Sequence, residues 1–349
     1  MANETSYGDI SPRTAAYAVK KLLKRGQAET VVDKFAQIVP VPKNKSKKIV
    51  FRRYETLGKA MTPLTEGVTP TAQKLTKTDV EATLQQYGGL AGLTDVINDT
   101  HEDPILNEMA DLIGEQAGET LEAIKIGILN AATNRFYCGG TATASVSKPI
   151  DLSMLRMVNR AFRRVRARKI TQIIKAGPNI ATEPVGASFV LLGHTDLEAD
   201  IREITGFVPV EKYAGLRPIS EFEVGKVENF RVILTSMFEP ELQAGATVGD
   251  YLSNGVKPPA IVPGEGDNPA TGGGKADVYT MIAIARDAYA FTPLAGKNAA
   301  TISVLNPGKI SKSDPLGQRG YVGWKSWMAG AILQDTWIAN IECAATAQY

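Results

Sequence analysis

One long helical pattern, from residue 103 to about residue 136, constrains this chain more than any other feature of its sequence. Asp103 and Pro104 form a favourable start, because aspartate accepts hydrogen bonds from the first free N–H groups and proline at the first helical position loses none. Apolar residues then recur at helical spacing, which predicts a helix over residues 104–136 that stops at Gly139-Gly140. At about 1.5 Å per residue this helix would be about 50 Å long, more than the depth of one ordinary core. We therefore expect a spine against which several other elements pack.

Residues that build reactive or metal-binding sites are few. The chain has two cysteines, Cys138 and Cys343, and two histidines, His101 and His194, without metal-ligand spacing. The common nucleophile, zinc-protease and nucleotide-binding motifs are missing, so His194 before Asp196 is better explained by capping or packing than by catalysis. We find no signal peptide and no apolar run of about twenty residues. We expect a structural protein rather than an enzyme, with free, mostly buried thiols and without a metal, a cofactor or a membrane segment.

The formal net charge of +2 hides three strongly charged segments. Residues 79–124 contain eleven acidic residues and no Lys or Arg, whereas 40–60 contain seven basic residues and one Glu, and 151–175 contain eight basic residues and one Asp. A single charged run is most often a solvated surface, but opposite blocks on one chain can also pair between copies of that chain. The extent of the segregation favours pairing between copies.

Two segments of the remaining sequence suggest contact surfaces. Strands predicted at 47–57 and 78–87 form a hairpin whose Gly- and Pro-containing tip has little to bury. An enzyme lid or an arm across the next subunit would explain such a tip. A second helix, from Leu152 to about Lys169, is covered by arginine outside its apolar stripe of Leu155, Val158, Phe162 and Val165, which indicates nucleic acid or an acidic protein surface as partner.

The rest of the pattern indicates an α+β fold. Strands at 189–192, 230–234 and 279–284, with a short helix at 196–204, predict a compact unit, interrupted by a Gly- and Pro-rich loop over 239–275. Residues 302–344, which carry the three tryptophans, alternate enough to predict sheet that returns to pack against the spine.

In this order the elements resemble the HK97-type major capsid proteins of tailed bacteriophages. Some stretches are similar to the short-tailed, podovirus-like branch: Tyr87-Gly88-Gly89-Leu90, Gly114-Glu115-Gln116-Ala117, His194-Thr195-Asp196-Leu197, Glu223-Val224-Gly225-Lys226-Val227 and Gly323-Trp324-Lys325. The resemblance covers nearly the whole chain and rests on the order and spacing of these motifs. It implies an HK97-type fold with an N-terminal arm (1–46), an E-loop hairpin (47–87), a P-domain with the spine helix (88–185), an A-domain (186–295) and returning P-domain strands (296–349).

The resemblance also implies a structural major capsid protein that self-assembles into hexamers and pentamers of an icosahedral shell around double-stranded DNA. Assembly would take place in the bacterial host cytoplasm, with scaffolding, portal and decoration proteins as further partners. We expect the hairpin to lie across the acidic spine of a neighbouring copy, with Arg52, Arg53 and Lys59 against Glu108, Asp111, Glu115 and Glu119. Basic residues of the N-terminal arm are expected to face the genome or a scaffold through sequence-independent contacts: Arg13, Lys20, Lys21, Lys24 and Arg25.

Two alternatives stay open at this point. An encapsulin-like nanocompartment uses the same fold to package an enzyme and contains no genome. A free nucleic-acid-binding protein would use the basic helix at 156–169 and would leave the spine and the hairpin without a role.

Overall fold

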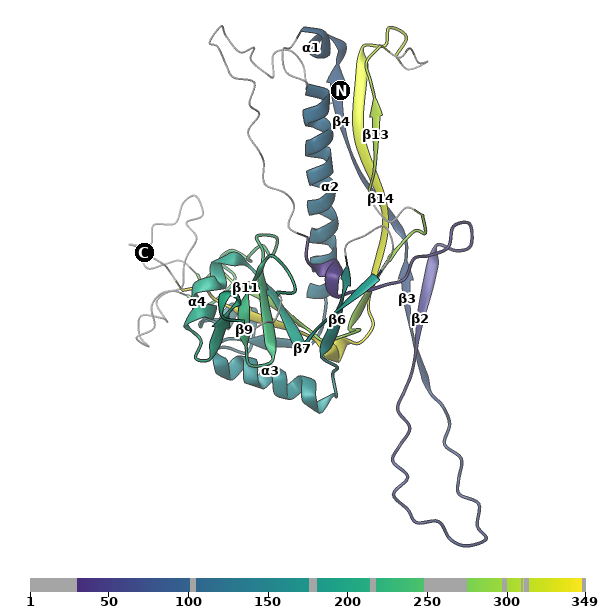
Figure 1. The fold of residues 1–349 in the computed structure, drawn as a ribbon, viewed down its shortest axis with the longest axis vertical. Coiled ribbons are helices and arrows are strands. Elements are labelled where there is room, and N and C mark those ends of the chain that lie inside the picture. The colour runs from purple at the N-terminus through teal and green to yellow at the C-terminus, as the bar shows by residue number, and fades with distance from the viewer. Residues whose placement is uncertain are drawn as a thin grey trace.

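The structure is a computed structural model of the chain, and it describes residues 30–100, 105–175, 181–213, 218–247, 275–296, 300–308, 310 and 314–346. Three parts are visible in Figure 1. A tall arm, here called the spine unit, contains helix α2 (Ile105–Asn130) and a five-stranded sheet. The compact unit lies at its foot and is built on an eight-stranded sheet. The hairpin of β2 (Lys48–Tyr54) and β3 (Lys77–Thr83) projects in the direction opposite to the arm.

The spine unit is held together by the apolar face of α2 against its sheet. The sheet has the order β1-β12-β14-β13, and β4 pairs with β14 in addition. Ile113 and Ala117 of α2 are buried against Val322 and Trp324 of β14. The apolar residues whose spacing predicts the helix therefore form its contact with the sheet, as expected for a spine. The strands are β1 (Gln37–Ile38), β4 (Gln85–Thr94), β12 (Tyr289–Pro293), β13 (Thr301–Leu305) and β14 (Arg319–Ile332), and the short helix α1 (Asp95–Thr100) follows β4.

A glycine lets helix and sheet approach closely in this core. The indole Nε1 of Trp324 donates to Gln116 Oε1 at 3.2 Å. A Cβ atom added at Gly89 of β4 would lie 2.6 Å from that Gln116 oxygen and 2.8 Å from the Trp324 nitrogen. Any larger residue at 89 would therefore displace the Trp324–Gln116 hydrogen bond.

The predicted end of the spine helix is wrong by six residues, because α2 ends at Asn130 rather than at 136. The side-chain amide of Asn340 donates to the carbonyls of Leu129 and Asn130, at 3.3 and 3.1 Å, and so caps the last turn. Residues Arg135–Tyr137 then form β5, which pairs in parallel with Asn340, Ile341 and Glu342. A sheet partner about 200 residues away outweighs the local helical pattern. The predicted start at Asp103 and Pro104 lies outside the described residues.

The compact unit is a sheet covered on both faces. Its order is β5-β15-β11-β7-β10-β9-β8, with β6 paired to β7. Phe189 and Leu191 of β7 face the core that contains α3, whereas Val190 and Leu192 face a second core with the last turns of α2. The predicted strands at 189–192, 230–234 and 279–284 are confirmed. The elements are β6 (Ile170–Lys175), β7 (Ala181–Gly193), β8 (Phe207–Pro209), β9 (Glu223–Val227), β10 (Phe230–Leu234), β11 (Tyr279–Ile284), β15 (Ile338–Cys343), α3 (Leu152–Arg164) and α4 (Glu198–Glu203).

Helix α3 begins as predicted and ends earlier than predicted. Asp151 Oδ1 accepts a hydrogen bond from the Met154 N–H at 2.8 Å, as an N-cap residue should. At the other end Arg166 has a φ of 54°, and the Ala167 N–H donates to the Phe162 carbonyl at 2.8 Å. This is a Schellman ending, so the helix stops at Arg164 instead of continuing to Lys169. Val165 therefore leaves the predicted apolar stripe and is 39% exposed.

Four of the predicted ranges also need correction. The hairpin ends at residue 83 rather than 87, and residues Gln85–Thr94 form strand β4 against β14. Strand β12, inside the predicted 186–295 unit, belongs to the spine sheet, and β5, α3 and β6, inside the predicted 88–185 unit, belong to the compact unit. Strand β15, which was expected to return to the spine, pairs with β11 and β5 of the compact unit. Alternation of apolar residues predicts a strand, but the sheet that the strand joins depends on distant partners.

Candidate assembly surfaces

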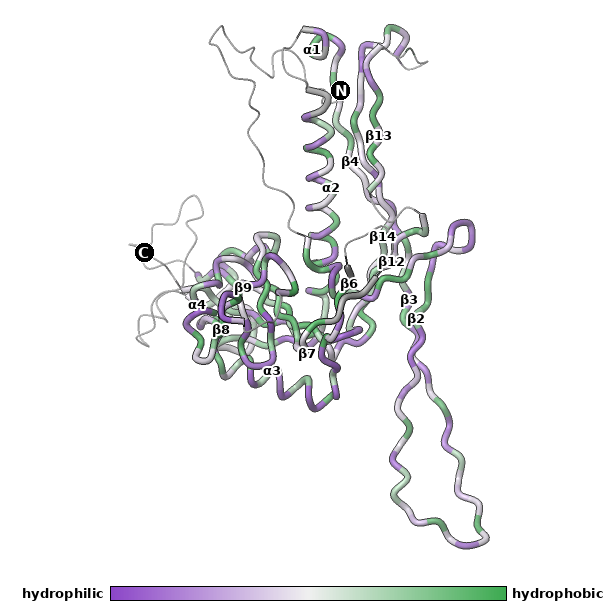
Figure 2. Tube along the Cα trace, viewed as in Figure 1, coloured by the Kyte–Doolittle hydropathy of each residue, from purple (hydrophilic) through white to green (hydrophobic). Residues whose placement is uncertain are grey.

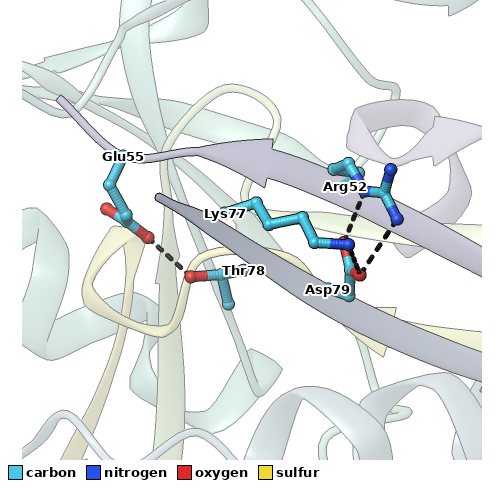
Figure 3. A network of polar contacts seen from close by, with 5 residues as sticks. All are labelled: Arg52, Glu55, Lys77, Thr78 and Asp79. Atoms are coloured by element: carbon cyan, nitrogen blue, oxygen red, sulfur yellow. Dashed lines mark hydrogen bonds and ion pairs between the residues drawn. The ribbon is translucent and has the colours of Figure 1, made fainter. Parts of the chain in front are cut away.

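The base of the hairpin is held by charged pairs across its two strands (Figure 3). Arg52 lies opposite Asp79 in the register and binds it with two contacts, Nε to Oδ1 at 2.8 Å and Nη2 to Oδ2 at 3.2 Å. Lys77 adds a contact to Asp79 Oδ2 at 3.1 Å. Hydrogen bonds from Arg52 and then from Lys77 lower the pKa of Asp79 to about 2.

A second set of contacts links the two strands of the hairpin to each other and the hairpin to the body of the molecule. Glu55 Oε1 accepts from Thr78 Oγ1 at 2.7 Å and from Arg53 Nη2 at 3.0 Å, which lowers the pKa of Glu55. Arg53 also donates from Nη1 to the backbone carbonyl of Leu333 at 3.3 Å. Two of the three predicted contact cations, Arg52 and Arg53, are therefore paired within their own chain. Lys59 is exposed and has no acidic partner among the described residues.

The tip of the hairpin is apolar rather than basic. Residues 52–79 are all exposed, and the tip between the strands has no core of its own. Figure 2 shows hydrophobic residues distributed along this tip. Its basic residues, Lys59 and Lys74, are balanced by Glu55 and Glu66. Five large apolar side chains are exposed by half or more: Leu57, Met61, Leu64, Val68 and Leu75.

The four predicted acidic residues share one side of α2. Glu108, Asp111, Glu115 and Glu119 follow one another at spacings of three, four and four residues, so they form a stripe along the helix. Glu115 and Glu119 line an open groove between α2 and β4 together with Ala91, Met109 and Leu112. In the described part of the chain Asp111, Glu115 and Glu119 have no basic partner. Like charges four residues apart repel each other, so the last three of these residues, Asp111, Glu115 and Glu119, here called the acidic stripe, carry uncompensated negative charge.

An opposite charge pattern covers the outer face of α3. Arg156, Arg160, Arg163 and Arg164 are exposed and line one shallow groove with Asn159. Arg156 Nε contacts Glu228 Oε1 at 2.7 Å. The other three arginines have no acidic partner among the described residues. Figure 2 shows many hydrophilic residues along α3. By helical spacing these four arginines, here called the arginine face, lie on the side of the helix opposite the buried Leu155, Val158 and Phe162.

A buried carboxylate that the sequence did not predict, Glu122, anchors the part of the predicted N-terminal arm around Val31 and Val32. Glu122 Oε1 accepts the backbone N–H groups of Val31 and Val32 at 2.7 and 2.8 Å. Lys125 Nζ lies 2.5 Å from Asp33 Oδ2 and 3.6 Å from Glu122 Oε2. Burial raises the pKa of Glu122, and Lys125 and the two amides partly offset this. The available signal was an acidic residue on the α2 face that also carries the core residues Ile126 and Leu129.

The remaining predicted features add no contact surface among the residues that the structure describes. The arm residues Arg13, Lys20, Lys21, Lys24 and Arg25 lie outside the described residues, as does most of the predicted loop at 239–275. Cys138 and Cys343 are free and buried. Within the described ranges no three His, Cys, Asp or Glu side chains come together as metal ligands, and no helix is long and apolar enough to cross a membrane.

The arrangement of spine, compact unit and projecting hairpin is found in solved phage capsids. The chain is similar to the head protein of Helicobacter pylori bacteriophage KHP40, with a TM-score of 0.60, 10% identity, and coverage of 99% of this chain and 98% of that one. It is similar to the capsid of Ralstonia phage GP4, with a TM-score of 0.61, 12% identity, and coverage of 97% and 100%. The capsid of cyanophage P-SCSP1u gives a TM-score of 0.57 at 10% identity, covering 99% and 100%. The fold is that of the HK97-type capsid proteins.

The sequence itself identifies the family. A family model described as phage capsid protein matches residues 77–292, which is more than half of the chain, so the chain belongs to the phage capsid protein family. No curated protein sequence matches it. The predicted class of structural major capsid protein, located in the virion capsid, is confirmed, and neither the nanocompartment nor the free nucleic-acid-binding alternative is favoured. The more specific resemblance to short-tailed phages stays a prediction.

Proposed function

We propose that this chain forms pentameric and hexameric rings of a closed icosahedral shell around double-stranded DNA, and that it assembles in the host cytoplasm without catalysing a reaction. The proposal that copies form rings is supported mainly by the hairpin tip, residues 55–76. This tip is exposed throughout, and its apolar side chains contact no core of their own chain. An exposed apolar segment of this size favours a protein contact. In a homo-oligomer the available partner is the next copy.

The base of the hairpin fixes the direction in which the tip leaves the body. The paired strands, the Arg52–Asp79 contacts and the Arg53 bond to Leu333 hold the first part of the hairpin before the tip begins. Arg52 and Arg53 therefore act first on the geometry of the hairpin, and Lys59 is the predicted cation that stays available for a neighbour. In the proposal the apolar tip supplies most of the contact to the next copy.

The test compares two changes within the tip. Met61→Asp with Leu64→Asp should leave the subunit folded, since both side chains are exposed, and should abolish closed shells because two charges would enter an apolar contact. Thr69→Asp with Thr71→Asp adds the same charge at polar tip positions and serves as the control. Sedimentation and negative-stain electron microscopy report the shells. Normal shells from the Met61 and Leu64 variant would overturn the role of the tip.

Further partners follow from the class of protein and stay proposals. Scaffolding, portal and decoration proteins and packaged DNA would bind a shell of this kind. Contact of the arm residues Arg13, Lys20, Lys21, Lys24 and Arg25 with DNA phosphates or a scaffold would weaken as salt rises. Shells of an arm variant with these five residues changed to glutamine should form and contain less DNA. A DNA content equal to that of wild type would count against this contact.

A further inference from the structure

We infer that the arginine face of α3 binds the acidic stripe of α2 on the adjacent copy within one ring. This inference rests on the proposed ring assembly and assigns it an electrostatic contact that the hairpin does not supply. The arginine face consists of Arg156, Arg160, Arg163 and Arg164, and the acidic stripe consists of Asp111, Glu115 and Glu119.

The direction of the arginine face is fixed by the core behind it. Leu155, Val158 and Phe162 are at most 1% exposed and are buried in the core of the compact unit. The helix cannot rotate without exposing these side chains, so the guanidinium groups on its opposite side stay at the surface. Arg160, Arg163 and Arg164 have no acidic partner in the described part of the chain. An acidic surface presented to this face would find several donors already in place.

The charges on the two helices also match in spacing. Arg156, Arg160 and Arg164 recur every four residues, and so do Asp111, Glu115 and Glu119. Four helical residues rise about 6 Å, so successive charges on both helices are separated by the same distance. Two such helices lying side by side can bring every carboxylate near a guanidinium. The repulsion within each stripe would then be replaced by attraction between stripes.

The placement of α2 and α3 in the molecule also favours this contact. In Figure 1 α3 runs along the lower edge of the compact unit and the hairpin projects downward to its right, whereas α2 rises toward the upper end of the molecule. Identical copies in a ring contact one another head to tail, so one side of each copy meets the opposite side of the next. The ring geometry therefore brings α3 and the hairpin of one copy toward the α2 arm of its neighbour.

The hairpin offers little free positive charge that could compete for the acidic stripe. Four of its basic residues are compensated within the chain: Arg52 and Lys77 contact Asp79, Arg53 contacts Glu55, and Lys48 contacts Glu81. Lys59 stays available on the tip. Arg160, Arg163 and Arg164 carry the concentrated uncompensated charge. An arginine face can also neutralise DNA phosphates, but the matched spacing favours the neighbouring copy.

The test is a charge swap. Arg160→Glu with Arg164→Glu, and separately Asp111→Lys with Glu119→Lys, should each lower the yield of shells by about tenfold or more, because like charges would face each other. All four substitutions in one chain should restore the yield to within about twofold of wild type, since every interface is then attractive again. Lys45→Glu with Lys47→Glu makes the same charge change at an exposed turn and should assemble normally. Circular dichroism and the Tm establish that each variant is folded.

Three results would overturn the inference. Normal shells from the Arg160 and Arg164 variant would show that the arginine face is not needed for assembly. Normal shells that contain less DNA would assign the face to the genome. A fourfold variant that stays unassembled while both double variants are folded would show that the two stripes do not face each other. Failure of the wild-type chain and of the Lys45 and Lys47 control to form shells would count against the proposed function instead.

Discussion

Glu122 and Val31, 91 residues apart in the chain, are joined by a buried hydrogen bond of 2.7 Å from the Val31 N–H to Glu122 Oε1. The same oxygen accepts the Val32 N–H, and the Tyr289 hydroxyl donates to the Val32 carbonyl at 2.8 Å. These contacts fix the point at which the N-terminal segment enters the body, between the spine helix and the compact unit. They also place a carboxylate where burial opposes its ionisation.

Glu122→Ala should reduce the free energy of unfolding by about 2–4 kcal/mol, because two buried N–H groups lose their acceptor and Lys125 loses a neighbouring charge. Glu122→Gln should cost less, since its amide oxygen can still accept both hydrogen bonds and burial already disfavours the ionised acid. Urea unfolding of the unassembled subunit measures both. Glu119→Ala, at an exposed position of the same helix, is the control and should change stability by less than about 0.5 kcal/mol. Equal values for Glu122→Ala and Glu119→Ala would contradict the anchor.

The hairpin should lose its order in acid before the core does. The pKa of Asp79 is lowered from 3.8 to about 2 in the folded chain, so its contribution is present above pH 3.8 and is lost as the pH falls toward 2. Hydrogen exchange in β2 and β3, compared with β10 of the compact unit, should therefore accelerate selectively in this window. Asp79→Asn should exchange faster at neutral pH, with a smaller further change on acidification. Acceleration in all three strands together would contradict a local effect.

The cap on α2 should stabilise the whole fold. Asn340→Ala removes the hydrogen bonds to the carbonyls of Leu129 and Asn130 inside the core and should cost about 1–3 kcal/mol in thermal or urea unfolding. Gln86→Ala, on an exposed strand position, should cost little. A stability loss at 340 no larger than at 86 would show that the carbonyls are satisfied in another way.

The two thiols should be inert in the native chain. Burial raises the pKa of Cys138 to about 12 and that of Cys343 well above its ordinary value, so neither forms the reactive thiolate at pH 8. Iodoacetamide followed by mass spectrometry should find both unmodified in the folded subunit and both modified in urea. Rapid stoichiometric labelling of the native protein would contradict this burial.

The sequence predicts the local elements better than their partners. Helix periodicity identifies α2, and the buried strands β7, β10 and β11 lie where continuous apolar runs indicate them. The end of α2 and the sheet membership of β12 and β15 depend on residues such as Asn340, which lie far away in the chain. Local patterns contain no information about such partners, so these boundaries were wrong.

The predicted surfaces show the same division. The acidic stripe follows directly from helical spacing, but the predicted role of Arg52 could not include its pairing with Asp79, which depends on the register of the hairpin. Charge counts alone made the hairpin the basic partner. The pairing within the hairpin transfers that role, in our proposal, to the arginine face of α3.

Sedimentation velocity combined with negative-stain electron microscopy of the expressed chain, at low and moderate salt, tests the central claim most directly. The account predicts closed shells built of rings, formed by the wild-type chain and lost when the hairpin tip receives Met61→Asp and Leu64→Asp. A folded chain that stays a monomer or dimer at every salt concentration, also with a scaffolding protein supplied, would contradict assembly into a shell.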